Sequence, residues 1–198
     1  MHTVFLGALL ISPAVQPNSV PAAAPVASSS SNPWDPASRI EAQRKAMEAL
    51  AFLDGAWRGG AEAQAGGGRL IQTERVGPIL GGTVKLVEGR AYDAADRTVF
   101  NALGVISYDP VKRAYSMRAH AMGYAGDYPL EVRPDGFRWV QPMGPGASIR
   151  YTATIRNGEW HEIGERLEGS APASKMFEMR LRRIGDTAWP ASGAVPRQ

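Results

Sequence analysis

The side chains in this sequence that could carry acid–base chemistry are few. Three histidines are present, and His2 lies in a segment with the features of an export signal, which leaves His120 and His161 for the mature protein. In an extended strand His161 alternates onto the same face as Glu165. Arg118 and His120 share a face in the same way. Facing a cavity, an imidazole beside a carboxylate could act as acid or base, whereas on an outer surface it would be a structural histidine in an ion pair. A shift of one residue exchanges the two faces, so the sequence leaves both orientations open.

A second group of polar and aromatic residues falls on other predicted strands. Gln72 and Glu74 share one strand face, and aromatic surface comes from later strands. A cavity with several aromatic rings and a few fixed polar groups suits a small apolar or aromatic ligand, although the same residues could pack a ligand-free core. The predicted cavity residues are Trp57, Gln72, Glu74, Arg118, His120, Trp139, Tyr151, His161 and Glu165.

Composition argues against several other classes of site. No cysteine is present among the 198 residues, which excludes disulfides, thiol nucleophiles and lipid-modified cysteines. Lys and Arg number 22 against 19 Asp and Glu, and they are scattered along the chain, so nucleic acid is not an expected partner. The glycines at 66–68 lack the following helix and lysine of a phosphate-binding loop. No metal site and no cofactor are predicted, and the oligomeric state is not indicated.

The first 22 residues have the pattern of a secretory signal peptide. Residues 4–15 form an apolar run too short to span a membrane, and small residues with prolines follow it. Cleavage is expected after Ala22, although the first three residues lack the usual positive charge. Residues 23–37 are predicted to be a flexible linker and residues 187–198 a flexible tail. We therefore expect a periplasmic or secreted protein with no stable membrane insertion after cleavage.

One domain is predicted over residues 38–186. It begins with a helix over 38–53 that is capped by Ser38. Gly55 then permits a turn into a strand, where Trp57 is predicted to plug one end of a barrel. Runs of β-branched and aromatic residues follow, broken about every 8–12 residues by turn residues, among which Asn157 and Gly158 predict a tight hairpin. The strands are predicted at 55–63, 69–77, 82–92, 98–108, 113–121, 127–132, 136–141, 147–156, 160–168 and 174–184.

The number and order of these strands favour a closed barrel. A flat sheet would leave two unpaired edges, and closure removes both. The predicted fold class is therefore all-β, an antiparallel up-and-down β-barrel of about ten strands with the N-terminal helix as a lid. Such an interior is either nearly filled by side chains or large enough to hold one small ligand.

Five short motifs occur in order along the predicted barrel, at 52–59, 73–82, 106–110, 160–165 and 177–181. In this order they resemble a bacterial calycin-like family of unknown function, whose members are lipocalin-like barrels. The resemblance implies the barrel fold and no agreed activity.

The first motif is also similar to the opening of nitrobindin-type haem barrels. These share Gly-x-Trp-x-Gly and carry a haem-ligating histidine late in the chain. Here Ala61 replaces the third glycine of that pattern, and the last predicted strand has Met176 and Met179 but no histidine. Haem is therefore an alternative, with His120 or His161 as its ligand.

Three functional hypotheses result. In the first, the protein is an exported lipocalin-like barrel that binds a small hydrophobic or aromatic molecule. In the second, it is a cofactor-free enzyme in which His161 or Glu165 acts as acid or base. In the third, it is a nitrobindin-like barrel that binds haem.

Overall fold

The structure, a computed structural model, describes residues 35–63 and 67–187. The predicted signal segment at 1–22, most of the linker at 23–37 and the tail after Thr187 lie outside the described residues. No helix within the described ranges has the length and apolar character needed to cross a membrane.

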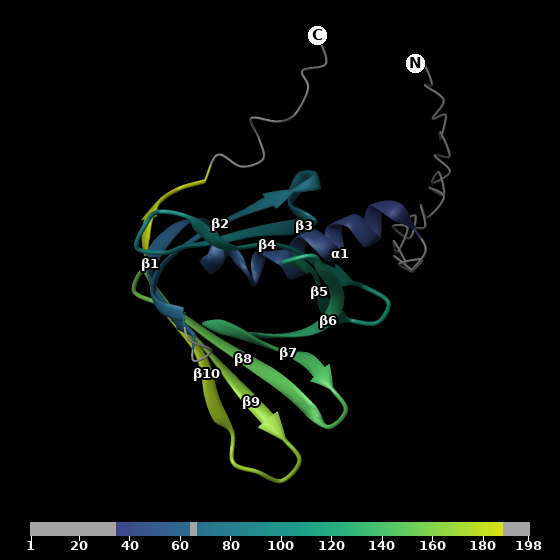
Figure 1. Ribbon diagram of the computed structural model, residues 1–198. Helices are drawn as coiled ribbons and strands as arrows, with labels where there is room; N and C mark the ends of the chain where they lie inside the picture. Colours follow the sequence, from purple (N-terminus) through teal and green to yellow (C-terminus); the bar gives the residue numbers. More distant parts are fainter. Residues whose placement is uncertain (1–34, 64–66, 188–198) are drawn as a thin grey trace, which may run out of the picture. The chain divides into compact units, whose positions relative to one another are not determined.

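Ten antiparallel strands within the described residues form a closed barrel (Figure 1), which confirms the predicted fold class. Each strand pairs with its neighbours in sequence, and β1 pairs with β10 to close the wall. The strands are β1 (Gly55–Ala63), β2 (Gly67–Ile79), β3 (Val84–Tyr92), β4 (Thr98–Asp109), β5 (Ala114–Ala121), β6 (Tyr124–Arg133), β7 (Gly136–Gly144), β8 (Ala147–Arg156), β9 (Glu159–Glu168) and β10 (Ser174–Gly185).

The predicted hairpin at Asn157 and Gly158 is confirmed. Both residues have positive φ, 53° and 72°, as a two-residue turn with the right-handed twist of the strands requires. The turn pairs Arg156 with Glu159 and, one step further, Ile155 with Trp160. It therefore fixes the register between β8 and β9.

The N-terminal helix α1 (Pro36–Glu48) begins earlier than predicted. Asp35, and not Ser38, is the N-cap, because the Asp35 carboxylate accepts a hydrogen bond of 2.8 Å from the Ser38 backbone N–H. Pro36 suits the first helical position, where no N–H is needed. The helix also ends earlier, and a separate 3₁₀ turn, η1 (Ala51–Leu53), leads into β1.

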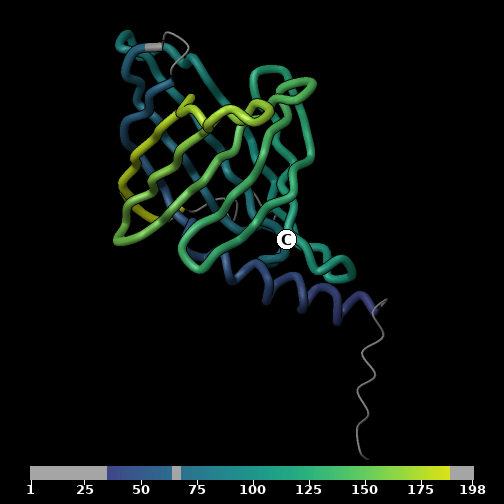
Figure 2. Tube along the Cα trace, turned by 90° about the horizontal axis from the view of Figure 1, so that it is seen from below, coloured from purple at the N-terminus to yellow at the C-terminus, as the bar shows by residue number. Residues whose placement is uncertain are grey.

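α1 lies across one end of the barrel (Figure 2). The Tyr115 hydroxyl donates to the Ala46 carbonyl over 2.7 Å, and the Gln43 amide donates to the Tyr108 carbonyl over 3.1 Å. Arg44 reaches the carbonyl of Gly81 in the short 3₁₀ turn η2 (Leu80–Gly82). The helix therefore covers an end of the barrel, as expected of a lid. We call this the closed end and the opposite one the far end.

Trp57 seals the closed end from inside, as predicted. Its side chain is 1% exposed, and its indole N–H donates to the Leu53 carbonyl over 2.8 Å. Trp160 packs edge-on against it with ring centroids 5.8 Å apart. Beside this cluster, the buried Lys85 ammonium forms an ion pair with Asp54.

Candidate functional site

Of the two orientations that the sequence leaves open for β9, the structure has the one that turns the cavity candidates His161 and Glu165 outward. Burial alternates so that Trp160, Glu162 and Gly164 are buried and face the interior. His161 and Glu165 consequently lie on the outer wall. There His161 Nε2 is 2.9 Å from Glu178 Oε1 of β10, and Arg150 donates to Glu165 over 2.7 Å.

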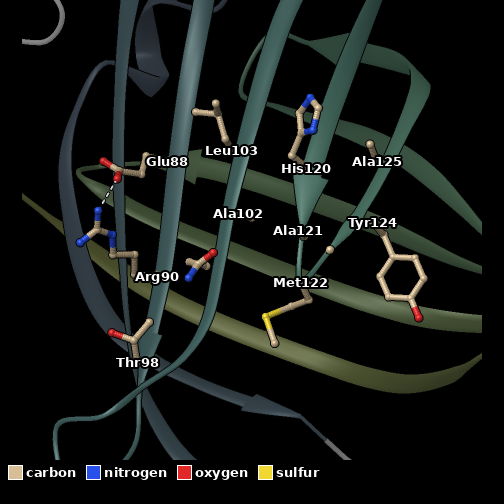
Figure 3. A pocket seen from close by; sticks show the side chains of 12 residues that line it. Glu88, Arg90, Thr98, Ala102, Leu103, His120, Ala121, Met122, Tyr124 and Ala125 are labelled. Carbon is tan, nitrogen blue, oxygen red and sulfur yellow. Dashed lines mark hydrogen bonds and ion pairs between the residues drawn. The ribbon is translucent and has the colours of Figure 1, made fainter.

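Arg118 and His120 are also on the outer wall. Met117 and Ala119 occupy the inward positions of β5, and the Arg118 guanidinium pairs with Asp127 of β6 over 2.6 Å. His120 lines an outer depression of about 870 Å³ over β3 to β6. Figure 3 shows the side chains that line it. Its other charged residues, Glu88 and Arg90, are bonded to each other. Neither predicted histidine therefore lines the interior.

The remaining five predicted cavity residues face inward. They are Trp57, Gln72, Glu74, Trp139 and Tyr151. Sequence reasoning missed Glu162, which lies on the face opposite the one chosen for β9. The Asn157–Gly158 turn carried the missing signal, because it places Trp160 across from Ile155 and so on the same face as Tyr151. The role of these residues in binding remains a prediction.

Glu74 on β2 is a buried carboxyl group with a neutral hydrogen-bond donor. Its side chain is 9% exposed, and Gln72 Nε2 donates to Glu74 Oε1 over 2.6 Å. Gly89 on β3 leaves space for the carboxyl, since a Cβ atom there would lie 2.7 Å from Glu74 Oε1. Burial raises the pKa of Glu74 to about 8, and the charge of Glu162 adds to the rise, while the Gln72 hydrogen bond opposes it. Glu74 is therefore largely protonated at neutral pH.

Glu162 on β9 is the second buried carboxyl group. It is 7% exposed and accepts a hydrogen bond of 3.1 Å from Trp160 Nε1. Burial raises the pKa of Glu162 to about 7, and hydrogen bonding by the indoles of Trp160 and Trp139 limits the rise. Near neutral pH this group can therefore either donate or accept a proton.

Four aromatic side chains line one inner side of the barrel, and we call them the aromatic wall. Trp139 and Tyr151 are stacked, with ring centroids 4.3 Å apart and an interplanar angle of 11°. Tyr128 packs against Trp139 at 5.1 Å, and Phe177 packs against Tyr151 at 6.3 Å. Gly164 makes room for them, since a Cβ there would lie 2.9 Å from the Tyr151 ring.

The aromatic wall lies towards the far end and is incompletely covered. Phe177 pairs with Ala63, at the end of β1 away from Trp57. All four wall residues face inward, yet each is only partly buried. Several inward positions of β3 to β5 carry small residues, namely Gly89, Ala91, Ala102, Gly104 and Ala119. The Glu74 carboxyl group lies over Gly89, and the Met117 side chain lies over Gly104.

The described interior does not fit a histidine-ligated haem. His120 and His161 both lie on the outer wall, so neither imidazole can reach an iron inside the barrel. Met117 and Met179 are buried and face inward, but neither supplies the histidine ligand of the nitrobindin-type barrels.

Comparison with known proteins adds a likeness in structure. No family model and no curated protein matches the chain. Fourteen chains of solved structures match it, among them the crystal structure of Rv2717c from M. tuberculosis. That structure has a TM-score of 0.51 and 14% identity, over 70% of this chain and 96% of the other. The likeness is one of fold. It supports the barrel, whereas membership of a calycin-like or nitrobindin-type family stays a prediction.

Proposed function

We propose that this barrel binds a small apolar or aromatic molecule in its interior, with one face of the ligand against the aromatic wall. The observation that carries the proposal is the partial exposure of four aromatic side chains that face inward in a closed barrel. Rings that only packed a ligand-free core would be covered, as Trp57 and Trp160 are at the closed end. Glu74 and Glu162 provide the few fixed polar contacts of such a site. The proposal includes a lipocalin-like relationship, which the fold is compatible with.

A neutral fluorescent probe, N-phenyl-1-naphthylamine, tests this proposal. We expect stoichiometric binding with enhanced probe emission and quenching of tryptophan fluorescence. Ala119→Phe would place a ring in the interior beside the wall, because β5 pairs with the strand of Tyr128, and should weaken binding at least tenfold. His161→Ala, on the outer wall, is the matched control and should leave affinity unchanged. No binding by the wild type, or equal binding by Ala119→Phe, would contradict an interior site.

An enzymatic alternative now depends on Glu162 instead of His161 and Glu165. A carboxyl group with a pKa of about 7 in a buried site is suited to general acid–base catalysis. Proton abstraction from 5-nitrobenzisoxazole measures such a base directly. Activity that follows the ionisation of Glu162 and is lost in Glu162→Gln would favour an enzyme, whereas binding without turnover would favour a carrier.

We also propose that the protein is exported, on the basis of the apolar run at 4–15 and the small residues that follow it. N-terminal sequencing of protein from the native host should find a mature chain that begins near Ala23. Recovery of the intact N-terminus from the cytoplasm would overturn this proposal.

A further inference from the structure

The two interior carboxyl groups have no cationic partner in the described part of the chain. Within residues 35–63 and 67–187, neither Glu74 nor Glu162 forms a hydrogen bond or ion pair with Lys, Arg or His. Lys85 is buried, but Asp54 holds it at the closed end. Buried carboxylates are normally paired, so their lack of a partner here needs a physical explanation.

Glu74 also keeps an oxygen that no described donor reaches. Gln72 donates to Oε1, and no described group donates to Oε2, although the side chain is nine-tenths buried. Arg138 Nε is the one fully buried side-chain nitrogen or oxygen atom among the described residues that lacks a partner, so Glu74 Oε2 is not fully enclosed and keeps accessible surface. The free oxygen of Glu74 is on the inner side of the barrel, where the carboxyl group lies over Gly89.

The aromatic wall adjoins the second carboxyl group. Glu162 acts electrostatically on the Tyr151 hydroxyl and accepts hydrogen bonding from the Trp139 indole. Trp139 and Tyr151 stack face to face, and the part of their π surface that stays uncovered can attract an organic cation. Unpaired carboxyl groups and a π surface are thus found together in one interior.

We propose that the interior site takes a small organic cation, a quaternary or protonated amine that carries an apolar or aromatic group. Its ammonium head lies between Glu74, Glu162 and the aromatic wall, and its apolar part extends towards the far end. This inference rests on the proposed function and specifies the ligand class. Near neutral pH and without a ligand, Glu74 is largely protonated and Glu162 partly so, and the cation therefore displaces a proton to solvent, which keeps charge in the interior balanced.

Because a proton is released when the cation binds, the affinity for the cation depends on pH. A quaternary ammonium ion does not itself titrate, so its affinity should rise with pH as the carboxyl groups ionise. From pH 6 to pH 9 the rise should be about tenfold from Glu162 alone, with its pKa of about 7, and larger with Glu74, whose pKa of about 8 makes it ionise over the same range. A neutral ligand should bind equally or more weakly at pH 9.

The titratable and charged groups around the two carboxyls are Tyr128 and Tyr151 of the wall, Glu88 behind β3, and the Lys85–Asp54 pair.

Phenyltrimethylammonium and tert-butylbenzene form a matched pair for the experiment, because they have the same shape and differ in charge. Displacement of N-phenyl-1-naphthylamine reports the affinity of each at pH 6 and pH 9. We expect the cation to bind more tightly than its neutral counterpart at pH 9, with the advantage reduced at least tenfold at pH 6. Glu162→Gln and Glu74→Gln should each weaken cation binding at pH 9 at least tenfold and leave tert-butylbenzene unaffected. Glu178→Gln, on the outer wall, is the control and should change neither.

The outcomes separate this inference from the proposed function. Binding of tert-butylbenzene without preference for the cation would overturn the inference and leave the interior site standing. Cation binding that survives both glutamine substitutions would also overturn it, because the site would lie elsewhere. Failure of every probe, including N-phenyl-1-naphthylamine, would refute both. The wild-type pH comparison decides the matter even if one variant does not fold.

Discussion

Replacing Glu162 by glutamine should make the barrel more stable at high pH. The folded-state pKa of Glu162 is raised from 4.5 to about 7, so the proton favours the folded state. This contribution is fully present below about pH 4.5 and is lost as the pH rises through about 7. Each unit of pKa shift corresponds to 1.36 kcal/mol, which gives a loss of about 3 kcal/mol for Glu162. Glutamine keeps the size and the acceptor for Trp160 but cannot ionise.

Urea unfolding followed by tryptophan fluorescence at pH 5 and pH 9 measures the effect. At pH 5 the wild type and Glu162→Gln should differ by less than about 1 kcal/mol, since both side chains are then neutral in the folded state and Glu162 is only partly ionised in the unfolded chain. At pH 9 the free energy of unfolding of the variant should exceed that of the wild type by about 3 kcal/mol. The difference between variant and wild type is compared at the two pH values, so the contributions of all other titrating groups to the free energy of unfolding cancel.

Glu178→Gln is the control with the opposite sign. The pKa of Glu178 is lowered to about 2 by hydrogen bonds from Lys175 and His161, so its contribution is present above about pH 4.5 and is lost as the pH falls towards 2. That variant should therefore be destabilised at both pH values without recovering at pH 9. If Glu162→Gln behaves in the same way, Glu162 is solvated and the reasoning about the interior is refuted.

Three further predictions concern stability and are measured by chemical denaturation. Trp57→Ala should lower the free energy of unfolding by about 3–5 kcal/mol, because it opens a cavity at the closed end and leaves the Leu53 carbonyl without its donor. A loss under about 1 kcal/mol would mean that Trp57 does not seal that end. Gly59→Ala should lower the free energy of unfolding by roughly 3 kcal/mol or more, because a Cβ would lie 2.0 Å from the Arg180 carbonyl oxygen. The control is Gly60→Ala, whose Cβ would meet no atom closer than 3.7 Å, and equal effects of the two variants would argue against close contact between β1 and β10. Asp54→Asn should lower the free energy of unfolding by about 3 kcal/mol, because it leaves the Lys85 ammonium buried without a partner. Lys85→Met should lower it clearly less, and the reverse order would show that Lys85 is hydrated.

Most of the barrel could be predicted from the sequence because local signals are enough to define it. The strand at 147–156 was predicted with its observed bounds, since Gly146 and the Asn157–Gly158 turn mark its ends. The start of α1 was missed by two residues because Asp35 and Ser38 are both acceptable caps, and Pro36 favours the earlier one.

The interior of β9 could not be read from hydrophobic alternation. Ile163 and Leu167 made the outer face look like the apolar one, whereas the inner face carries a glutamate and a glycine beside Trp160. The glycine is explained by the Tyr151 ring, a partner on the adjacent strand that a linear pattern does not contain. Alternation fails where the inside of a barrel is polar or small. Those are the positions at which a ligand would be recognised.

The closure of the wall between β1 and β10 has a consequence for biosynthesis. Among the described strands, every other pair is adjacent in the chain, so those hairpins can form as each segment is synthesised. β1 must wait for its second partner until β10, which begins at Ser174, has been made. During that interval the growing sheet has two free edges that can pair with other chains. A nonsense mutation upstream of β10 would therefore yield an open, aggregation-prone sheet and not a smaller barrel.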